Sequence, residues 1–162
     1  MRLLVICLGN ICRSPMAEGV LRARIEGSPL AGRVVLDSAG TGAWHVGQPP
    51  DRRAIATTAR HGIEIADLRA RQLASEDFIR HDWLLCADRS NLRDVRNRAP
   101  ASLHSRTALL LREWAGVVDD DEVPDPYSGG PAEFEAVFEL LDRAAHGVIA
   151  RLQSACDKRG RT

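Results

Sequence analysis

The sequence lacks an excess of either charge, because 22 Lys and Arg residues balance 22 Asp and Glu residues in a chain of 162. This balance gives no electrostatic reason to bind nucleic acid or an anionic membrane, and we expect neither as a partner. Long apolar runs are also missing. The longest one near the start, Leu3–Leu8, is too short for a signal sequence or a transmembrane helix. We therefore expect a cytoplasmic protein that does not insert into membranes.

Cysteine is scarce as well, with four residues, of which two lie in the segment Cys7–Pro15. Four cysteines are too few for a disulfide scaffold in a chain of this size, so we expect reduced thiols. A zinc site would need a further Cys or His pair at ligand spacing, and the other two cysteines and the five histidines supply none. Taken alone, two cysteines at C-x4-C spacing are more often structural or redox-active than catalytic.

What the sequence does contain is an alternation of short apolar runs with helical patterns, which predicts an α/β fold built on a small parallel sheet. The expected strands are Leu3–Ile6, Arg33–Gly40 with a glycine loop at its end, Asp82–Cys86, and Thr107–Leu111, for which a short helix fits nearly as well. The expected helices begin at Ser14-Pro15 and end at Gly27, and then cover Arg52–Arg60, Arg89–Asn97 and Glu133–Ala155, with a loop over Val117–Gly130. Repeats and linkers are missing, so one domain is predicted.

The segment Cys7–Ser14 follows the first strand, where open α/β sheets bind their ligands. A loop wrapped over a helix N-terminus forms a cradle of N–H groups for an anion, and Arg13 adds a planar fork for two oxygens. Gly9 and Asn10 tolerate the backbone angles of such a loop. The same dipoles favour the thiolate of Cys7, a nucleophile for a bound phosphoryl group, while Ser14 can donate a hydrogen bond to the sulfur.

A nucleophile that attacks phosphorus also needs an acid to protonate the departing oxygen. Asp125 lies between two prolines in V-P-D-P-Y-S-G-G, and the neighbouring Tyr127 can provide a wall for an aromatic substrate. The alternative is a surface turn, which Asp-Pro pairs favour by themselves.

The stretches V-I-C-L-G-N-I-C-R-S-P-M-A-E at the start and D-P-Y at residues 125–127 resemble the low-molecular-weight protein tyrosine phosphatases. The similarity continues through S-A-G-T, W-H-V-G-Q-P-P-D-R-R-A, H-G-I, A-R-Q-L-A-S-E-D-F and D-R-S-N-L-R-D, so residues 1–162 are expected to form a single domain of this family. The resemblance implies a four-stranded parallel sheet flanked by helices in a flavodoxin-like three-layer arrangement, with no metal and no cofactor.

The resemblance also implies a role for each matching residue. Cys7 matches the nucleophile, Arg13 the phosphate-binding arginine and Asp125 the general acid and base. The remaining matches fall into four groups: a phosphate-binding loop of Leu8, Gly9, Asn10, Ile11, Cys12 and Ser14; a polar network of Asn10, Ser14, Ser38 and His61; crevice walls of Leu8, Ile11, Trp44 and Tyr127; and a redox partner, Cys12, for the nucleophile. The open alternatives are a helix-capping role for His61 and simple packing for Trp44.

The expected substrate is a phosphotyrosine-containing protein, such as a bacterial tyrosine kinase of polysaccharide export, and the enzyme is expected to be a monomer or a weak dimer. Three rivals stay open. Phosphoarginine phosphatases of this fold carry threonine where this chain has Ile11, and thiol-dependent arsenate reductases need relay cysteines, for which Cys86 has no partner at Leu92 or Arg93. A silent phosphotyrosine-binding module would need a damaged catalytic residue. Ser128 after Tyr127 also departs from relatives that carry two adjacent aromatics.

Overall fold

The protein is built around a four-stranded parallel sheet with the strand order β2-β1-β3-β4. The computed structural model describes residues 1–159, apart from the side chains of residues 111, 112 and 156–159. The strands are β1 (Arg2–Cys7), β2 (Val35–Gly40), β3 (Trp83–Cys86) and β4 (Thr107–Leu109). The helices are α1 (Arg13–Glu26), α2 (Arg52–Arg60), α3 (Asp77–Arg80), α4 (Arg89–Arg98) and α5 (Pro131–Arg159), with a 3-10 turn over Ala101–Arg106 and a π-helical turn over Leu110–Ala115.

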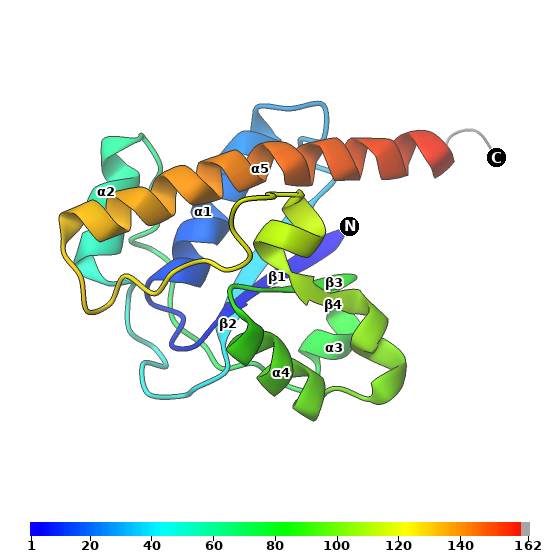
Figure 1. The fold of residues 1–162 in the computed structure, drawn as a ribbon, viewed down its shortest axis with the longest axis horizontal. Helices are drawn as coiled ribbons and strands as arrows, with labels where there is room; N and C mark the ends of the chain where they lie inside the picture. Colours follow the sequence, from blue (N-terminus) through cyan, green and yellow to red (C-terminus); the bar gives the residue numbers. More distant parts are fainter. Residues whose placement is uncertain (160–162) are drawn as a thin grey trace.

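The sheet separates two apolar layers, which gives the predicted three-layer α/β arrangement (Figure 1). Alternate residues of β1 point to opposite faces. Leu3 and Val5 join one buried cluster with the apolar faces of α1 and α5, and Leu4 and Ile6 join the other with residues of α3 and α4. The central strand β1 is buried from Leu3 to Cys7, so its carboxyl end delivers Cys7 and the following loop to the edge of the sheet.

Most expected elements are confirmed, with shifts at their ends. The helix expected to begin at Ser14-Pro15 begins at Arg13, and its N-cap is Cys12 without a side-chain cap. The Ser14 hydroxyl does not cap this helix, because Ser14 already lies inside its first turn and its hydroxyl is directed to Cys7. The short helix α3 and the turn at Ala101–Arg106 were not predicted, since neither is long enough to show a periodic pattern.

The fourth strand is shorter than the expected Thr107–Leu111, because the chain turns into the π-helical segment at Leu110. Leu109, the last residue of β4, pairs with Cys86, and its N–H donates to the Glu113 carboxylate of the following turn at 2.9 Å. Gly147 of α5 makes room for this turn, since a Cβ there would lie 1.8 Å from the Ala115 carbonyl oxygen. None of the helices within residues 1–159 combines the length and apolar character needed to cross a membrane.

Candidate active site

The loop from Leu8 to Cys12 joins β1 to α1 and turns around the side chain of Cys7. Asn10 adopts a left-handed conformation (φ 57°), which Asn tolerates better than most residues. This turn aims the Asn10 backbone N–H at the Cys7 Sγ, 3.3 Å away. The Cys7 side chain is buried at the base of the loop, where its sulfur accepts this backbone hydrogen bond.

Ser14 is the second polar neighbour of the sulfur, with its Oγ 3.0 Å from the Cys7 Sγ. The side-chain amide of Asn10 donates to the same Oγ at 2.8 Å. The Ser14 hydroxyl has one hydrogen, for which the Cys7 sulfur at 3.0 Å is a nearer acceptor than the Ala39 carbonyl oxygen at 3.5 Å. The geometry thus suits a sulfur that accepts two hydrogen bonds, as a thiolate does.

The side chain of Asn10 is held at both ends. Its Nδ2 also donates to the Ser38 Oγ at 3.0 Å, and its Oδ1 accepts the Arg71 backbone N–H at 2.9 Å. The Ser38 hydroxyl in turn donates to the buried carboxylate of Glu18 at 2.6 Å. Burial raises the pKa of Glu18, against the opposing effects of the Ser38 hydrogen bond and the Arg22 guanidinium.

His61 does not belong to this network, and that prediction is wrong. Its ring stacks on Phe138 with the ring centres 3.8 Å apart, and its Nε2 contacts the Glu135 carboxylate. His61 is the C-cap residue of α2, so the chain ends the helix there and leaves the ring on α5. The structure thus shows the helix-capping role that was the alternative for His61. In place of His61, Glu18 and Arg71 complete the polar network.

Arg13 begins α1 and is buried, and its guanidinium lies between two carboxylates. Its NH1 donates to the Asp88 Oδ2 at 2.6 Å and to the Val123 carbonyl at 3.1 Å, and its NH2 lies 3.5 Å from the Asp125 Oδ2. Burial by itself would lower the pKa of Arg13, but Cys7 and the two carboxylates reverse this and raise it. The arginine is therefore a fixed cation beside the sulfur.

Asp125 lies on the rim of the same hollow and is half exposed. Its Oδ1 accepts the Tyr127 backbone N–H at 3.1 Å, an Asx turn that fixes the direction of the carboxylate. Asp125 therefore lies in a turn. A surface turn was the alternative to a catalytic role, but this turn itself directs the carboxylate of Asp125 to the site.

The loop, Arg13 and Asp125 enclose a cavity of about 200 Å³ that opens to solvent. Besides these groups, its walls are formed by Trp44, His45 and Tyr127. The side chain of Trp44 is 70% exposed, so it lines the crevice and is not a core residue. Of the residues predicted for the loop and the walls, only Asn10 and Ser14 do not line the cavity. The predicted residues that line it are Cys7, Leu8, Gly9, Ile11, Cys12, Arg13, Trp44, Asp125 and Tyr127.

Cys12 lies in the wall of the cavity and is buried. Burial raises the pKa of its thiol to about 12, with further contributions from Asp51, Cys7 and Asp125. Cys86 is also a buried, free thiol at the end of β3, and burial raises its pKa too. A cysteine so enclosed is poorly placed to pass a disulfide outward, which disfavours the arsenate reductase alternative.

Four residues around the site were missed from the sequence: Glu18, His45, Arg71 and Asp88. Asp88 had the clearest signal, because it follows the third strand directly and therefore lies at the same sheet edge as Cys7. It also caps α4, where its Oδ1 accepts the Asn91 N–H at 2.7 Å.

The comparisons with known proteins agree with this geometry. The family model described as low molecular weight phosphotyrosine protein phosphatase matches residues 2–158. A low molecular weight protein-tyrosine-phosphatase of Streptomyces coelicolor is 41% identical over 160 residues, which are 98% of this chain and 97% of that protein. A protein tyrosine phosphatase structure from Entamoeba histolytica superposes with a TM-score of 0.90 at 34% identity, covering 96% of this chain and 98% of that one. The YfkJ structure from Bacillus subtilis gives 0.88 at 34% identity, covering 96% of each. The chain belongs to the low molecular weight phosphotyrosine protein phosphatases, hydrolases that act on phosphotyrosine.

Proposed function

We propose that the protein removes the phosphate from phosphotyrosine in two steps, through a phosphocysteine formed on Cys7. The Cys7 thiolate attacks phosphorus, the S–P bond forms, and the bond to the tyrosyl oxygen breaks as Asp125 protonates that oxygen. Water then attacks the phosphocysteine while the Asp125 carboxylate takes up its proton, which releases phosphate and restores the thiolate. The arrangement of the Cys7 Sγ, 3.3 Å from the Asn10 N–H and 3.0 Å from the Ser14 Oγ beside the Arg13 guanidinium, is the observation that supports this most directly.

In this proposal the phosphate lies in the loop Leu8–Cys12 and against Arg13. The loop's N–H groups and the guanidinium stabilise the negative charge of the transition state, so the residues present are sufficient for the charge stabilisation. Asn10, Ser14 and Ser38 hold the loop in shape, a role supported by their mutual hydrogen bonds.

The proposed substrate is an aromatic phosphoester on a protein. Ile11 contributes an apolar side chain to the cavity, and the rings of Trp44 and Tyr127 stand at its mouth, which suits a phenyl ring better than the charged guanidino group of phosphoarginine. A tyrosine kinase of bacterial polysaccharide export is the phosphoprotein that we propose to test first.

Two variants test the catalytic assignment. Cys7→Ser should lose turnover and still bind phosphate, because the serine hydroxyl is a much weaker nucleophile at neutral pH while the anion cradle remains. Asp125→Asn should lose activity strongly on tyrosyl phosphate and much less on an aryl phosphate with a good leaving group. Unchanged turnover in the first variant, or equal losses on both esters in the second, would contradict the respective role.

We also propose that Cys12 protects the nucleophile. Peroxide would oxidise Cys7 to a sulfenic acid with release of water, and the Cys12 thiol would then displace a second water to form a Cys7–Cys12 disulfide that a thiol can reduce. After peroxide treatment, wild type should recover activity with dithiothreitol, and Cys12→Ser should recover less. Equal recovery would contradict the protective role.

The remaining proposals concern the state of the protein in the cell. The free thiols of Cys7, Cys12 and Cys86 suit a reducing, cytoplasmic location. One sheet with its two apolar layers supports a single domain over residues 1–162. We propose a monomer or weak dimer, which sedimentation over a range of protein concentrations would test.

A further inference from the structure

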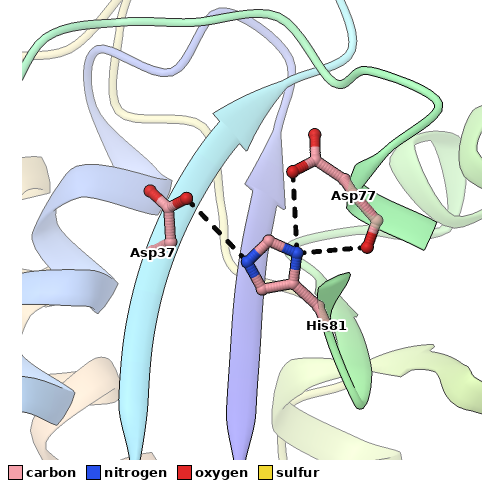
Figure 2. A group of neighbouring side chains, drawn as sticks. All are labelled: Asp37, Asp77 and His81. Carbon is pink, nitrogen blue, oxygen red and sulfur yellow. Dashed lines mark hydrogen bonds and ion pairs between the residues drawn. The ribbon is translucent and has the colours of Figure 1, made fainter. Parts of the chain in front are cut away.

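A cluster of four ionisable side chains lies on the α3 side of the sheet, next to the network of the phosphate-binding loop. His81, just after α3, is buried, and its ring lies between the carboxylates of Asp37 on β2 and Asp77 on α3 (Figure 2). The fourth member is Arg71, whose guanidinium bonds to Asp37 at 2.6 Å and to Asp77 at 2.9 and 3.0 Å.

The carboxylate oxygens of this cluster are fully engaged, which argues against a metal ion between them although the spacing of the three side chains would suit one. Arg71 takes the Asp37 Oδ2 and both oxygens of Asp77. The Asp37 Oδ1 accepts the Ser38 N–H at 2.8 Å, and the Asp77 Oδ2 also accepts the Ala74 N–H at 2.9 Å. The Arg71 guanidinium already supplies the positive charge that a metal ion would bring to these carboxylates.

Both nitrogens of the His81 ring face acceptors. The Nδ1 lies 3.1 Å from the Asp77 carbonyl oxygen and 3.6 Å from the Asp77 Oδ1, and the Nε2 lies 3.9 Å from the Asp37 Oδ2. A neutral imidazole that donates from Nδ1 to the Asp77 carbonyl oxygen turns an uncharged Nε2 lone pair towards Asp37, whereas an imidazolium attracts the Asp37 carboxylate, which at 3.9 Å is within ion-pair distance but beyond hydrogen-bond distance. As the cation, His81 also balances the charges of the cluster, with two positive and two negative groups.

Two connections lead from this cluster to the same side chain of the phosphate-binding loop. The Arg71 backbone N–H donates to the Asn10 Oδ1 at 2.9 Å. The Ser38 N–H is bonded to Asp37, and the Ser38 Oγ accepts from the Asn10 Nδ2 at 3.0 Å. Asn10 is also the residue whose left-handed backbone aims an N–H at the Cys7 sulfur.

We propose that His81 is a positioning residue whose protonation tightens the phosphate-binding loop, because the imidazolium fixes the carboxylates of Asp37 and Asp77. These carboxylates hold Ser38 and Arg71, which in turn hold the two ends of the Asn10 side chain. The charged groups within ion-pair distance of the ring are the carboxylates of Asp37 from β2 and Asp77 from α3, and Arg71 from the segment before α3 is bonded to both of them. The neighbouring Arg80 is exposed, and the carboxylate of the adjacent Asp82 is bonded to the Arg2 N–H at 2.7 Å. The catalytic consequence rests on the function proposed for the loop.

The first test compares the pH dependence of kcat/KM for wild type and His81→Gln, with His146→Gln as the matched control. His146 lies on α5, with its Nδ1 bonded to the Asp142 carbonyl oxygen in an exposed position. We expect His81→Gln to lose about fivefold in kcat/KM at acidic pH, as for coupled neighbouring charges. The loss should vanish as pH rises, because the neutral ring no longer carries the charge that attracts Asp37. In an Asp37→Asn background the pH-dependent loss should be small. A loss that is the same at all pH values would mean that His81 only packs, and would overturn the proposal.

The second test needs no catalysis and is independent of the role given to Cys7. In 15N-labelled wild-type protein, the side-chain amide resonances of Asn10 should shift with the same midpoint as the His81 ring protons, and this shift should be absent in His81→Gln. Asn10 resonances that do not follow the titration of His81 would refute the coupling even if the enzyme is fully active. Thermal unfolding at each pH would verify that the variants are folded.

Discussion

Asp88 has two roles in the structure that can be separated by substitution. Its Oδ1 accepts the Asn91 N–H at 2.7 Å and caps α4, and its Oδ2 accepts the Arg13 NH1 at 2.6 Å. Asparagine caps helices about as well as aspartate but removes the charge that faces Arg13, and alanine removes both functions. The pair Asp88→Asn and Asp88→Ala therefore measures the two contributions one after the other.

The magnitudes follow from the burial of the partners. The Arg13 side chain is 5% exposed and the Asp88 side chain 21%, so solvent screens this pair little. A hydrogen bond to a charged group contributes about 1.5–3 kcal/mol, which predicts a loss of about 2 kcal/mol of unfolding free energy for Asp88→Asn. Loss of the cap adds about 1 kcal/mol in Asp88→Ala. With a shift of about 2–4 °C per kcal/mol in a domain of this size, the melting temperature should fall by about 4–8 °C and about 6–12 °C, respectively.

Inorganic phosphate provides the decisive comparison. In the variants the buried Arg13 guanidinium loses its nearer negative partner and keeps only Asp125 at 3.5 Å, and a bound phosphate supplies a replacement, so phosphate should stabilise Asp88→Asn more than it stabilises wild type. The difference in melting temperature between the two proteins should therefore shrink as phosphate is added. An Asp88→Asn variant as stable as wild type without phosphate, or a difference that phosphate leaves unchanged, would refute the assignment of Asp88 as the partner that holds Arg13.

Three further predictions concern the surroundings of the loop. A Cβ on Gly40 would lie 2.7 Å from the Leu8 carbonyl oxygen, so Gly40→Ala should displace the phosphate-binding loop and lower kcat/KM by about 100-fold, measured with an aryl phosphate on folded protein. Because the pKa of Cys12 is raised to about 12, its alkylation by iodoacetamide in Cys7→Ser, followed by peptide mass spectrometry, should accelerate about tenfold per pH unit beyond pH 9; a plateau near pH 9 would contradict this. The pKa of Glu18 is raised by burial, so the native state favours its protonated form and loses that stability as pH rises. Relative to wild type, Glu18→Gln should therefore gain stability in urea unfolding as pH rises from about 4 to about 7, and an unchanged difference would argue against this sign.

The fold was predictable to the extent that burial imposes a pattern on consecutive residues. The run Leu3–Ile6 and the helical spacing in Glu133–Ala155 are strong signals because each element packs its apolar side chains against the core. The end of β4 was not predictable, since it depends on a carboxylate, Glu113, that takes the N–H of Leu109. That contact belongs to the turn that follows β4 and leaves no trace in hydrophobic periodicity.

The same distinction holds for the site. Cys7, Arg13 and Ser14 are close in sequence, and the motif that contains them places them together in the structure. Their supports come from distant segments. Arg71 is 61 positions from Asn10, and Asp88 is 75 positions from Arg13. A single sequence does not reveal such pairs, because a buried ion pair and two exposed charges have the same composition. His61 illustrates the converse error, in which a suitable residue type lies in a suitable segment but its ring is turned to α5.

The two carboxylates at Arg13 differ in a way that suits the proposed reaction. Asp88 is bonded at 2.6 Å and is also held by the Asn91 N–H, whereas Asp125 is 3.5 Å away and 50% exposed. The exposed ion pair between Arg13 and Asp125 contributes less than about 1 kcal/mol, so a phosphate group that enters the cavity easily replaces Asp125 beside Arg13. It does not exchange for Asp88, whose contact with Arg13 is shielded and shorter. We therefore expect substrate binding to release Asp125 from Arg13 and leave its carboxyl group free to move the proton, while Asp88 keeps the guanidinium aligned through both steps.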